Sequence, residues 1–352
     1  MIKKTRARAE HRGRRVELAR GTPEMSPIQI AAARALRTNR VDATAAEVAI
    51  ALREAGVYSL LLKGRTFARW LYADGEHRDY GDADLLVGPN QLSQAETVLA
   101  ELGFVKHLDS ADAPRHALHS HTWARRSDRA VVDLHWTLTG VGIPPDGLWR
   151  ELARRSETEE VAGQELECLD VVGRAFHVAL HAAHHGVRHS KPVEDLRRAL
   201  ARCDERTWVE AAMLARRLQA TPAFGVGLRL LPVGAELADR LGVPPNSSVM
   251  VALFAEHPTL ELAMGMQSLI DTRGARDKVE ILRRALWPSP RFMRAAFPRA
   301  RRGRTGLLLT YLGRPAWLLA RVPGALAGVR RARRAVRRDL ARGDEPPYDR
   351  PR

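Results

Sequence analysis

The chain has 352 residues, a formal net charge of +16 and two cysteines, Cys168 and Cys203. Its length allows two domains with separate cores, and so few cysteines exclude a disulfide-rich scaffold and favour a reducing, cytoplasmic compartment. No apolar run reaches the roughly 20 residues of a membrane span and the basic start lacks an apolar stretch, so we expect neither a transmembrane segment nor a signal peptide.

The positive charge gathers at the two ends of the sequence. Residues 1–20 contain eight Lys or Arg against two acidic residues, and residues 299–352 contain fifteen Arg against four, which leaves a net charge of −1 for residues 21–298. We interpret residues 1–24 as a basic flexible arm and residues 299–352 as a basic tail, both suited to RNA or an anionic membrane. The alternative for the tail is a helix that packs on the protein and ends in a solvated extension.

The next segment is predicted to form an α/β domain, residues 25–138, that begins with helices. Apolar residues at helical spacing follow the helix start Ser26-Pro27. Long helical crossovers and short loops both join the later strands, so the sheet should be mixed. Strands are predicted near residues 58–62, 82–88, 103–107, 117–125 and 129–136, with helices at 65–73 and 90–102.

The second half of the chain is predicted to be helical. Residues 139–170 contain several Gly and Pro and are interpreted as a connector. Residues 171–298 show helical patterning throughout, with Asp170 as the N-cap of the first helix. The predicted fold class is therefore α+β, a small mixed β-sheet domain followed by an all-helical domain.

Two aspartates one residue apart, Asp82 and Asp84, precede the apolar run 85–87. Alternate residues of a strand face the same side, so both carboxylates would share one face. Adjacent like charges are costly unless a cation lies between them. Asp133 lies in a second apolar stretch, residues 130–136. Three carboxylates on adjacent strands can hold two Mg²⁺ ions for phosphoryl or nucleotidyl transfer; the alternative is a solvated turn before an ordinary strand.

A glycine turn upstream of the aspartates is predicted to bind phosphate. The buried strand ends at Lys63-Gly64, and a helix begins at Arg65, so backbone N–H groups would face an anion. Lys63 and Arg65 would add positive charge, and Arg78 follows four residues before Asp82. The alternatives are a plain helix-entry turn at Gly64 and a surface lysine at the end of the strand.

Three motifs follow one another along the chain: Leu-Lys-Gly, Arg-x-x-x-Asp-x-Asp-Leu-Leu-Val and Val-Asp-Leu-His-Trp. With this ordered set the chain resembles the bacterial uncharacterised nucleotidyltransferase family, part of the DNA polymerase β-like nucleotidyltransferase superfamily. The resemblance covers residues 57–136 and extends more weakly to about residue 298. It implies Mg²⁺-dependent transfer of a nucleoside monophosphate from a nucleoside triphosphate to an acceptor, with pyrophosphate release. The implied metal ligands are Asp82, Asp84 and Asp133, and the implied nucleotide contacts are Lys63, Gly64, Arg65 and Arg78.

The resemblance leaves other functions open. Superfamily members usually have Gly-Ser or Gly-Gly at the phosphate turn, whereas Lys63 and Arg65 flank Gly64 here; this motivates a nucleotide-binding regulatory protein without turnover. The basic termini motivate an RNA-modifying, toxin-like nucleotidyltransferase. Family genes often lie beside genes for peptide or polysaccharide biosynthesis, which favours a small molecule, a peptide or a sugar as the acceptor.

A histidine-rich segment, residues 177–189, is predicted to be helical. His177, His181 and His184 have the i, i+4, i+7 spacing of one helical face. Such a face can bind zinc, but no His-Glu-x-x-His pattern and no adjacent cysteine pair support that reading. The resemblance implies a helix that lines the far wall of the cleft, and the alternative is a helix that only packs there. The candidates for substrate contact or general base are His181, His185, Glu194 and Asp195.

Overall fold

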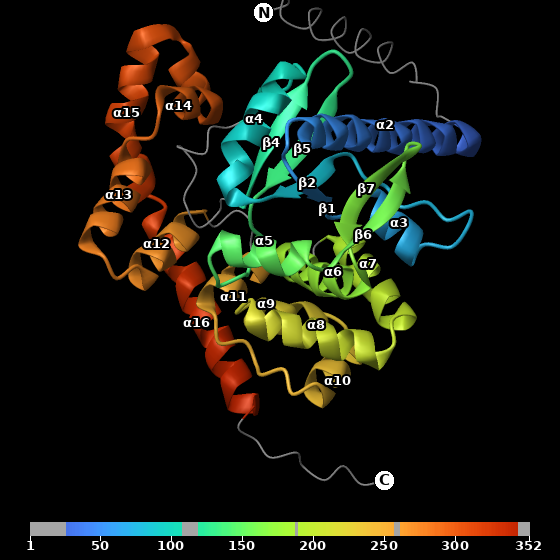
Figure 1. Ribbon diagram of the computed structural model, residues 1–352. Helices are drawn as coiled ribbons and strands as arrows, with labels where there is room; N and C mark the ends of the chain where they lie inside the picture. The colour runs from blue at the N-terminus through green and yellow to red at the C-terminus, as the bar shows by residue number, and fades with distance from the viewer. Residues whose placement is uncertain (1–25, 108–118, 187–188, 257–260, 344–352) are drawn as a thin grey trace, which may run out of the picture.

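The computed structural model describes residues 26–107, 119–186, 189–256 and 261–343 (Figure 1). A seven-stranded mixed sheet has helices on both faces, which confirms the predicted α+β class. The predicted flexible arm lies outside the described residues. The strands are β1 (Ser59–Leu61), β2 (Ala83–Val87), β3 (Val105–Lys106), β4 (Ser120–Arg125), β5 (Ala130–His135), β6 (Ser156–Val161) and β7 (Gln164–Leu169).

Strand β2 lies at the centre of the sheet, whose order is β3-β4-β5-β2-β1-β7-β6. It pairs antiparallel with β1 and parallel with β5, and all of its residues are buried. Because side chains alternate along a strand, Leu85 and Val87 belong to the core shared with helices α2 (Pro27–Glu54) and α4 (Leu92–Glu101), whereas Leu86 belongs to the core on the opposite face. Asp84 shares the face of Leu86, and this face is covered by helix α6 (Val171–His185).

The helices lie largely where the sequence predicts them, but one of them, α2, is longer than expected. The patterned region 26–56 forms a single helix, α2, in which the Ser26 hydroxyl accepts a hydrogen bond from the Gln29 amide at 3.3 Å as part of a capping box. The helices are α2 (Pro27–Glu54), α3 (Arg65–Leu71), α4 (Leu92–Glu101), α5 (Pro145–Ala153), α6 (Val171–His185), α7 (Ser190–Arg202), α8 (Glu205–Arg217), α9 (Thr221–Leu228), α10 (Pro232–Arg240), α11 (Val249–Glu256), α12 (Glu261–Asp271), α13 (Ala275–Leu286), α14 (Pro290–Ala296), α15 (Gly303–Leu319) and α16 (Val322–Gly343).

The interpretation of residues 139–170 as a connector is wrong. This segment contains helix α5 and the hairpin β6–β7, and β7 pairs in parallel with β1, so the sheet extends to Leu169. The hairpin turns at Ala162 and Gly163, whose φ angles of 52° and 77° are those of a tight two-residue hairpin turn. Three of the six residues of β6 are glutamates and only Val161 is buried there, while β7 buries Leu166, Cys168 and Leu169 between polar residues, so the apolar pattern of the hairpin is short and weak.

Helix α6 forms the centre of the helical region and separates it from the sheet (Figure 1). Asp170 is its N-cap as predicted, because the carboxylate accepts a hydrogen bond from the Gly173 amide at 2.7 Å. Helix α9 crosses α6 so closely that a Cβ at Gly227 would lie 2.0 Å from the Ala179 carbonyl oxygen. Only glycine permits this approach, so Gly227 allows α9 to pack directly on α6.

The predicted basic tail, residues 299–352, contains two long helices in its described part, α15 and α16. Helix α16 packs the buried residues Ala325, Val329, Ala332 and Val336 against α11 and α12. The helical region therefore continues beyond the predicted boundary at residue 298. The packing of α16 agrees with the packed-helix alternative for the tail, whose last residues, 344–352, lie outside the described residues. None of the helices in the described ranges is long and apolar enough to cross a bilayer.

Candidate functional site

A cavity of about 350 Å³ opens between the sheet and helix α6. Strands β2, β4 and β5 supply carboxylates and a hydroxyl on one side, and α6 supplies imidazoles on the other. The three predicted metal ligands, Asp82, Asp84 and Asp133, all line this one cavity. Its other charged and polar lining residues include Lys63, His119, Thr122, His135, His177, His181, His184 and His185.

Strand register brings the buried Asp84 and the half-buried Asp133 together. Strands β2 and β5 run in parallel with Asp84 directly opposite Asp133, as predicted for carboxylates on adjacent strands. Asp82 precedes β2 by one residue and is half-buried at the cavity. Ligand atoms of Asp84, Asp133 and His135 all lie within 4.8 Å of one another, which makes these three a group that could hold a metal ion. His135 lies two residues after Asp133 on β5, so the two side chains share one face of the strand.

Lys63 points into the carboxylate cluster. Its Nζ lies 2.9 Å from Asp84 Oδ1, and His135 Nε2 lies 3.1 Å from the same oxygen. The Asp84 side chain is only 2% exposed, so water does not screen this pair. Burial acts to lower the pKa of Lys63, but Asp84 and the neighbouring aspartates outweigh it and raise the pKa. Lys63 therefore stays charged and neutralises part of the negative cluster.

Asp133 has a different environment on the neighbouring strand. Its Oδ1 accepts a hydrogen bond from the Thr122 hydroxyl at 2.6 Å, across the β4–β5 pair. Burial and then the charge of Asp84 raise the pKa of Asp133. The two carboxylates therefore repel one another despite the presence of Lys63, and a divalent cation between them would relieve this repulsion.

The donor set fits a divalent cation. Asp84 Oδ2 is buried and has no hydrogen-bond partner among the described residues, and a buried carboxylate oxygen left unpaired costs free energy. Carboxylate oxygens are the preferred ligands of Mg²⁺, and an imidazole nitrogen is readily accepted by Mn²⁺ and other transition metals. A cation bound by Asp84, Asp133 and His135 would pair this oxygen.

The α6 side of the cavity is a wall of neutral histidines. Burial lowers the pKa of His177 and His184 to about 3, and that of His135 and His185 to about 4. The rings contact one another: His181 and His185 have centroids 4.6 Å apart. At neutral pH these imidazoles add no charge, so they can accept and donate hydrogen bonds beside the negative cluster without attracting further anions.

The predicted phosphate turn lies next to the cavity. Gly64 has a φ of 79° and precedes α3, a conformation that favours glycine, and its missing Cβ would contact the Tyr80 ring at 3.5 Å. Lys63 lines the cavity, whereas Gly64 and the exposed Arg65 are not among its lining residues. Nucleotide contact by all three residues stays a prediction.

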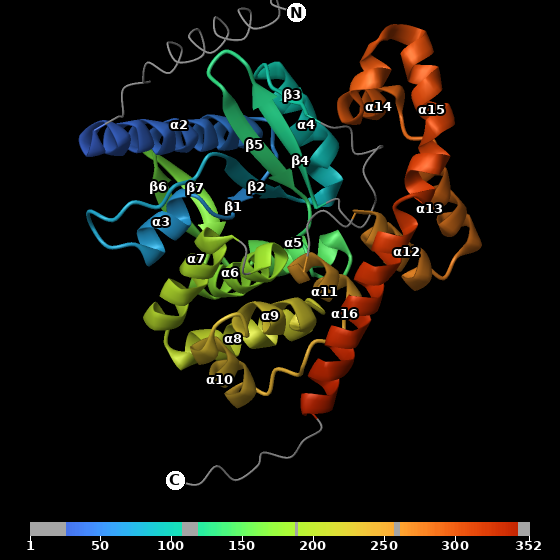
Figure 2. The same ribbon diagram turned by 180° about the vertical axis from the view of Figure 1, so that it is seen from behind.

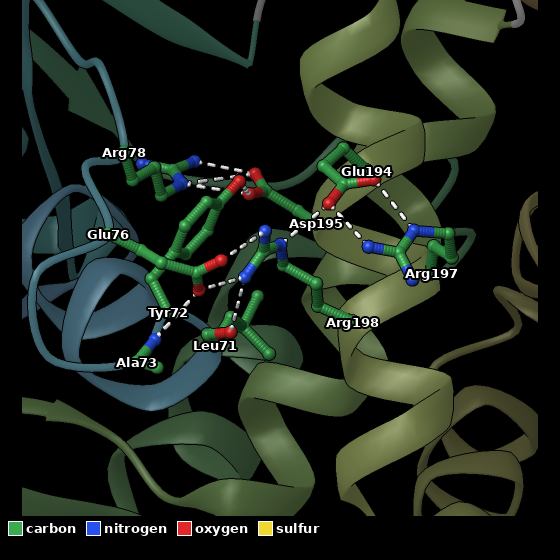
Figure 3. Close-up of polar contacts among 9 residues, drawn as sticks. All are labelled: Leu71, Tyr72, Ala73, Glu76, Arg78, Glu194, Asp195, Arg197 and Arg198. Atoms are coloured by element: carbon green, nitrogen blue, oxygen red, sulfur yellow. Dashed lines mark hydrogen bonds and ion pairs between the residues drawn. The ribbon is translucent and has the colours of Figure 1, made fainter.

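Arg78 connects the loop after α3 to helix α7, as Figure 3 shows. Its Nε and Nη2 donate to the two carboxylate oxygens of Asp195 at 2.9 and 2.7 Å, and the Tyr72 hydroxyl donates to the same carboxylate at 2.9 Å. Both charged side chains are almost fully buried. In this structure the guanidinium of Arg78 is occupied by a structural ion pair, so its predicted contact with the nucleotide would need that pair to share or exchange partners.

The residues proposed on the far wall separate into two groups. His181 and His185 line the cavity as expected. Asp195 is buried against Arg78, and Glu194 pairs with Arg197 and Arg198 on the surface of α7, so neither acid lies in the cavity lining (Figure 3). The Thr122 contact with Asp133 was missed, although its position opposite Asp133 on adjacent strands could have suggested it.

A family model described as "Uncharacterised nucleotidyltransferase" matches residues 29–233, more than half of the chain. No curated protein matches. Similar solved structures include the antibiotic-resistance factor ANT(2'')-Ia, with 16% identity over 52% of this chain and 95% of that chain and a TM-score of 0.38. The lincomycin-bound lincosamide antibiotic adenylyltransferase LnuA has 9% identity over 43% and 91%, with a TM-score of 0.29. An antigenic nucleotidyltransferase-like protein from Paracoccidioides brasiliensis has 11% identity over 53% and 92%, with a TM-score of 0.31.

Proposed function

The chain belongs to the uncharacterised nucleotidyltransferase family, and on this basis we propose that it transfers a nucleoside monophosphate from a nucleoside triphosphate to an acceptor in a Mg²⁺-dependent reaction. Pyrophosphate is the leaving group. The observation that supports this proposal most strongly is the facing pair of the buried Asp84 and the half-buried Asp133, which line one cavity and leave one Asp84 carboxylate oxygen unpaired among the described residues.

The metal ligands in this proposal are Asp82, Asp84 and Asp133, with His135 as a further donor beside them. When bound, Mg²⁺ would neutralise the triphosphate and stabilise the charge that develops on the leaving pyrophosphate. Two ions are proposed because a third carboxylate, Asp82, lines the same cavity. The protein itself contributes mainly the fixed positions of these groups, since β2 and β5 lie in the rigid centre of the sheet.

The proposed nucleotide contacts start from Lys63. Its ammonium lies at the carboxylate cluster and at the entrance to the Gly64 turn, so a triphosphate in the cavity would meet this charge. The Gly64 backbone and Arg65 would then contact the phosphates on the side of α3. Arg78 is proposed to act here through the Gly64 turn, whose carbonyl oxygen lies 3.5 Å from its Nη1.

The proposed acceptor is a small molecule, a peptide end or a sugar, in the cytoplasm. A cavity of about 350 Å³ has room for one reacting end of an acceptor rather than for a folded duplex. The neutral histidine wall can accept a hydrogen bond from an acceptor hydroxyl or amine, and so orient it towards the α-phosphorus.

The proposal is tested by incubating the protein with each α-labelled nucleoside triphosphate and a cell extract, with Mg²⁺ or with EDTA. We expect label to enter one class of extract component, pyrophosphate to appear in equal amount, and both to stop in EDTA. Tight nucleotide binding without pyrophosphate release would instead indicate a binding protein that has kept the fold, and label in total RNA would indicate an RNA-modifying enzyme.

A further inference from the structure

An exposed row of leucines follows one face of helix α15. Leu308, Leu312 and Leu319 are 59%, 69% and 69% exposed, and their i, i+4, i+11 spacing places them on one side of the helix. Leu309 lies beside them and is 50% exposed. Figures 1 and 2 show α15 at the outer edge of the molecule, away from α6, with α14 between it and the sheet edge formed by β3. These leucines therefore form a contiguous apolar face outside the domain that contains the cavity.

The surrounding sequence is strongly and uniformly basic. Residues 281–338 contain sixteen arginines and no acidic residue. Arg302 and Arg304 are exposed at the start of α15, and the Arg321 guanidinium lies 3.8 Å from the ring centroid of Trp317 just after its end. The leucine face therefore has positive charge at both of its ends. Contiguous apolar surface with basic flanks is the pattern of an interfacial amphipathic helix.

We propose that α15 attaches this protein to the surface of a bilayer rich in anionic phospholipids. The leucines would enter the boundary between headgroups and acyl chains, and the flanking arginines would pair with lipid phosphates. This inference goes beyond nucleotidyl transfer and does not depend on it, because the leucine face and the cavity are formed by different elements.

Lipid fits this surface better than the other partners that bear negative charge. Ribonucleic acid would pair with the arginines but would leave the leucine row in water, since none of these leucines offers a stacking or hydrogen-bonding group. A second copy of the chain could cover the leucines, but it would bring two acid-free, arginine-rich segments together and so add like-charge repulsion. An anionic bilayer satisfies the apolar face and the charge at once.

The test is co-sedimentation with vesicles of phosphatidylcholine alone and with vesicles of equal parts phosphatidylcholine and phosphatidylglycerol. We expect binding to the mixed vesicles only, and weaker binding as salt is added. The triple variant Leu308→Ser, Leu312→Ser, Leu319→Ser should lower the partition coefficient by roughly tenfold for each leucine. The matched control is Val233→Ser, because Val233 is 63% exposed on α10, away from α15, and should leave binding unchanged.

Three results would overturn the proposal. The first is equal binding of the triple variant and the original protein to mixed vesicles, with both proteins folded by circular dichroism. The second is binding of RNA but not of vesicles. The third is a stable dimer in light scattering that the triple variant converts to a monomer while vesicle binding is absent. Loss of vesicle binding in the triple variant with unchanged nucleotidyl transfer would support it.

Discussion

Replacing Lys63 by methionine tests the electrostatics of the cavity directly. The change keeps most of the volume of the side chain but removes the ammonium that lies 2.9 Å from Asp84. Asp84 is 2% exposed, and it would keep only the His135 contact on the same oxygen. Removing one partner of a buried ion pair typically costs roughly 3–5 kcal/mol. Because His135 remains, we expect a loss in the free energy of unfolding near the lower end of this range, measured by urea denaturation in EDTA.

Divalent metal should reverse this loss. A cation that binds the folded protein at a hundred times its Kd adds about 2.7 kcal/mol of stability. In the original protein a cation must compete with the Lys63 ammonium for the Asp84 carboxylate, whereas in the variant it does not. We therefore expect Mg²⁺ or Mn²⁺ to stabilise Lys63→Met more than it stabilises the original protein.

Lys106→Met is the matched control for this experiment. Lys106 pairs with Glu96 at 2.7 Å in a partly exposed position that does not line the cavity. Its loss should cost less, and the response to metal should stay that of the original protein. The reasoning would be refuted if Lys63→Met lost less than about 1 kcal/mol in EDTA, or if metal stabilised both proteins equally.

Two further predictions concern stability. Burial lowers the pKa of His177 from 6.5 to about 3, so between these pH values the unfolded chain binds a proton that the folded chain does not. The free energy of unfolding should therefore fall as the pH falls from 6.5 towards 3. Urea unfolding at several pH values should show this dependence, and it should be weaker in His177→Gln. Arg78→Met leaves Asp195 buried without its partner and should cost roughly 3–5 kcal/mol. Arg197→Ala, which removes a surface contact of α7, should leave the urea midpoint unchanged, and a similar midpoint for both arginine variants would contradict the structural role of Arg78.

The placing of Asp84 and Asp133 on one face of the sheet could be predicted because these residues conflict with their surroundings. Asp84 and Asp133 are charged residues inside apolar strands, and the period of two along a strand fixes which face they share. Their direct pairing then followed from strands that become neighbours in the sheet. Local pattern and tertiary structure agree at these positions, so the sequence was sufficient there.

Other parts of the site depend on contacts between distant segments. The Arg78–Asp195 pair joins residues 117 positions apart, and nothing in the local pattern around Arg78 distinguishes a partner on α7 from a nucleotide phosphate. The sequence placed Lys63 at the phosphate turn but did not show its contact with Asp84, because the direction of the side chain depends on tertiary packing. The β6–β7 hairpin was missed because its apolar face is short, formed by Val161, Leu166 and Cys168, and is interrupted by glutamates.

The facing carboxylates Asp84 and Asp133 are proposed to hold the Mg²⁺ ions that nucleotidyl transfer needs. We would measure the rate of label transfer from an α-labelled nucleoside triphosphate in the presence of Mg²⁺, for the original protein and for Asp84→Asn and Asp133→Asn. Both substitutions keep the shape of the side chain, and circular dichroism should show that both variants fold. We predict that each variant loses activity by on the order of a thousandfold. Transfer at an unchanged rate in both folded variants would contradict the account.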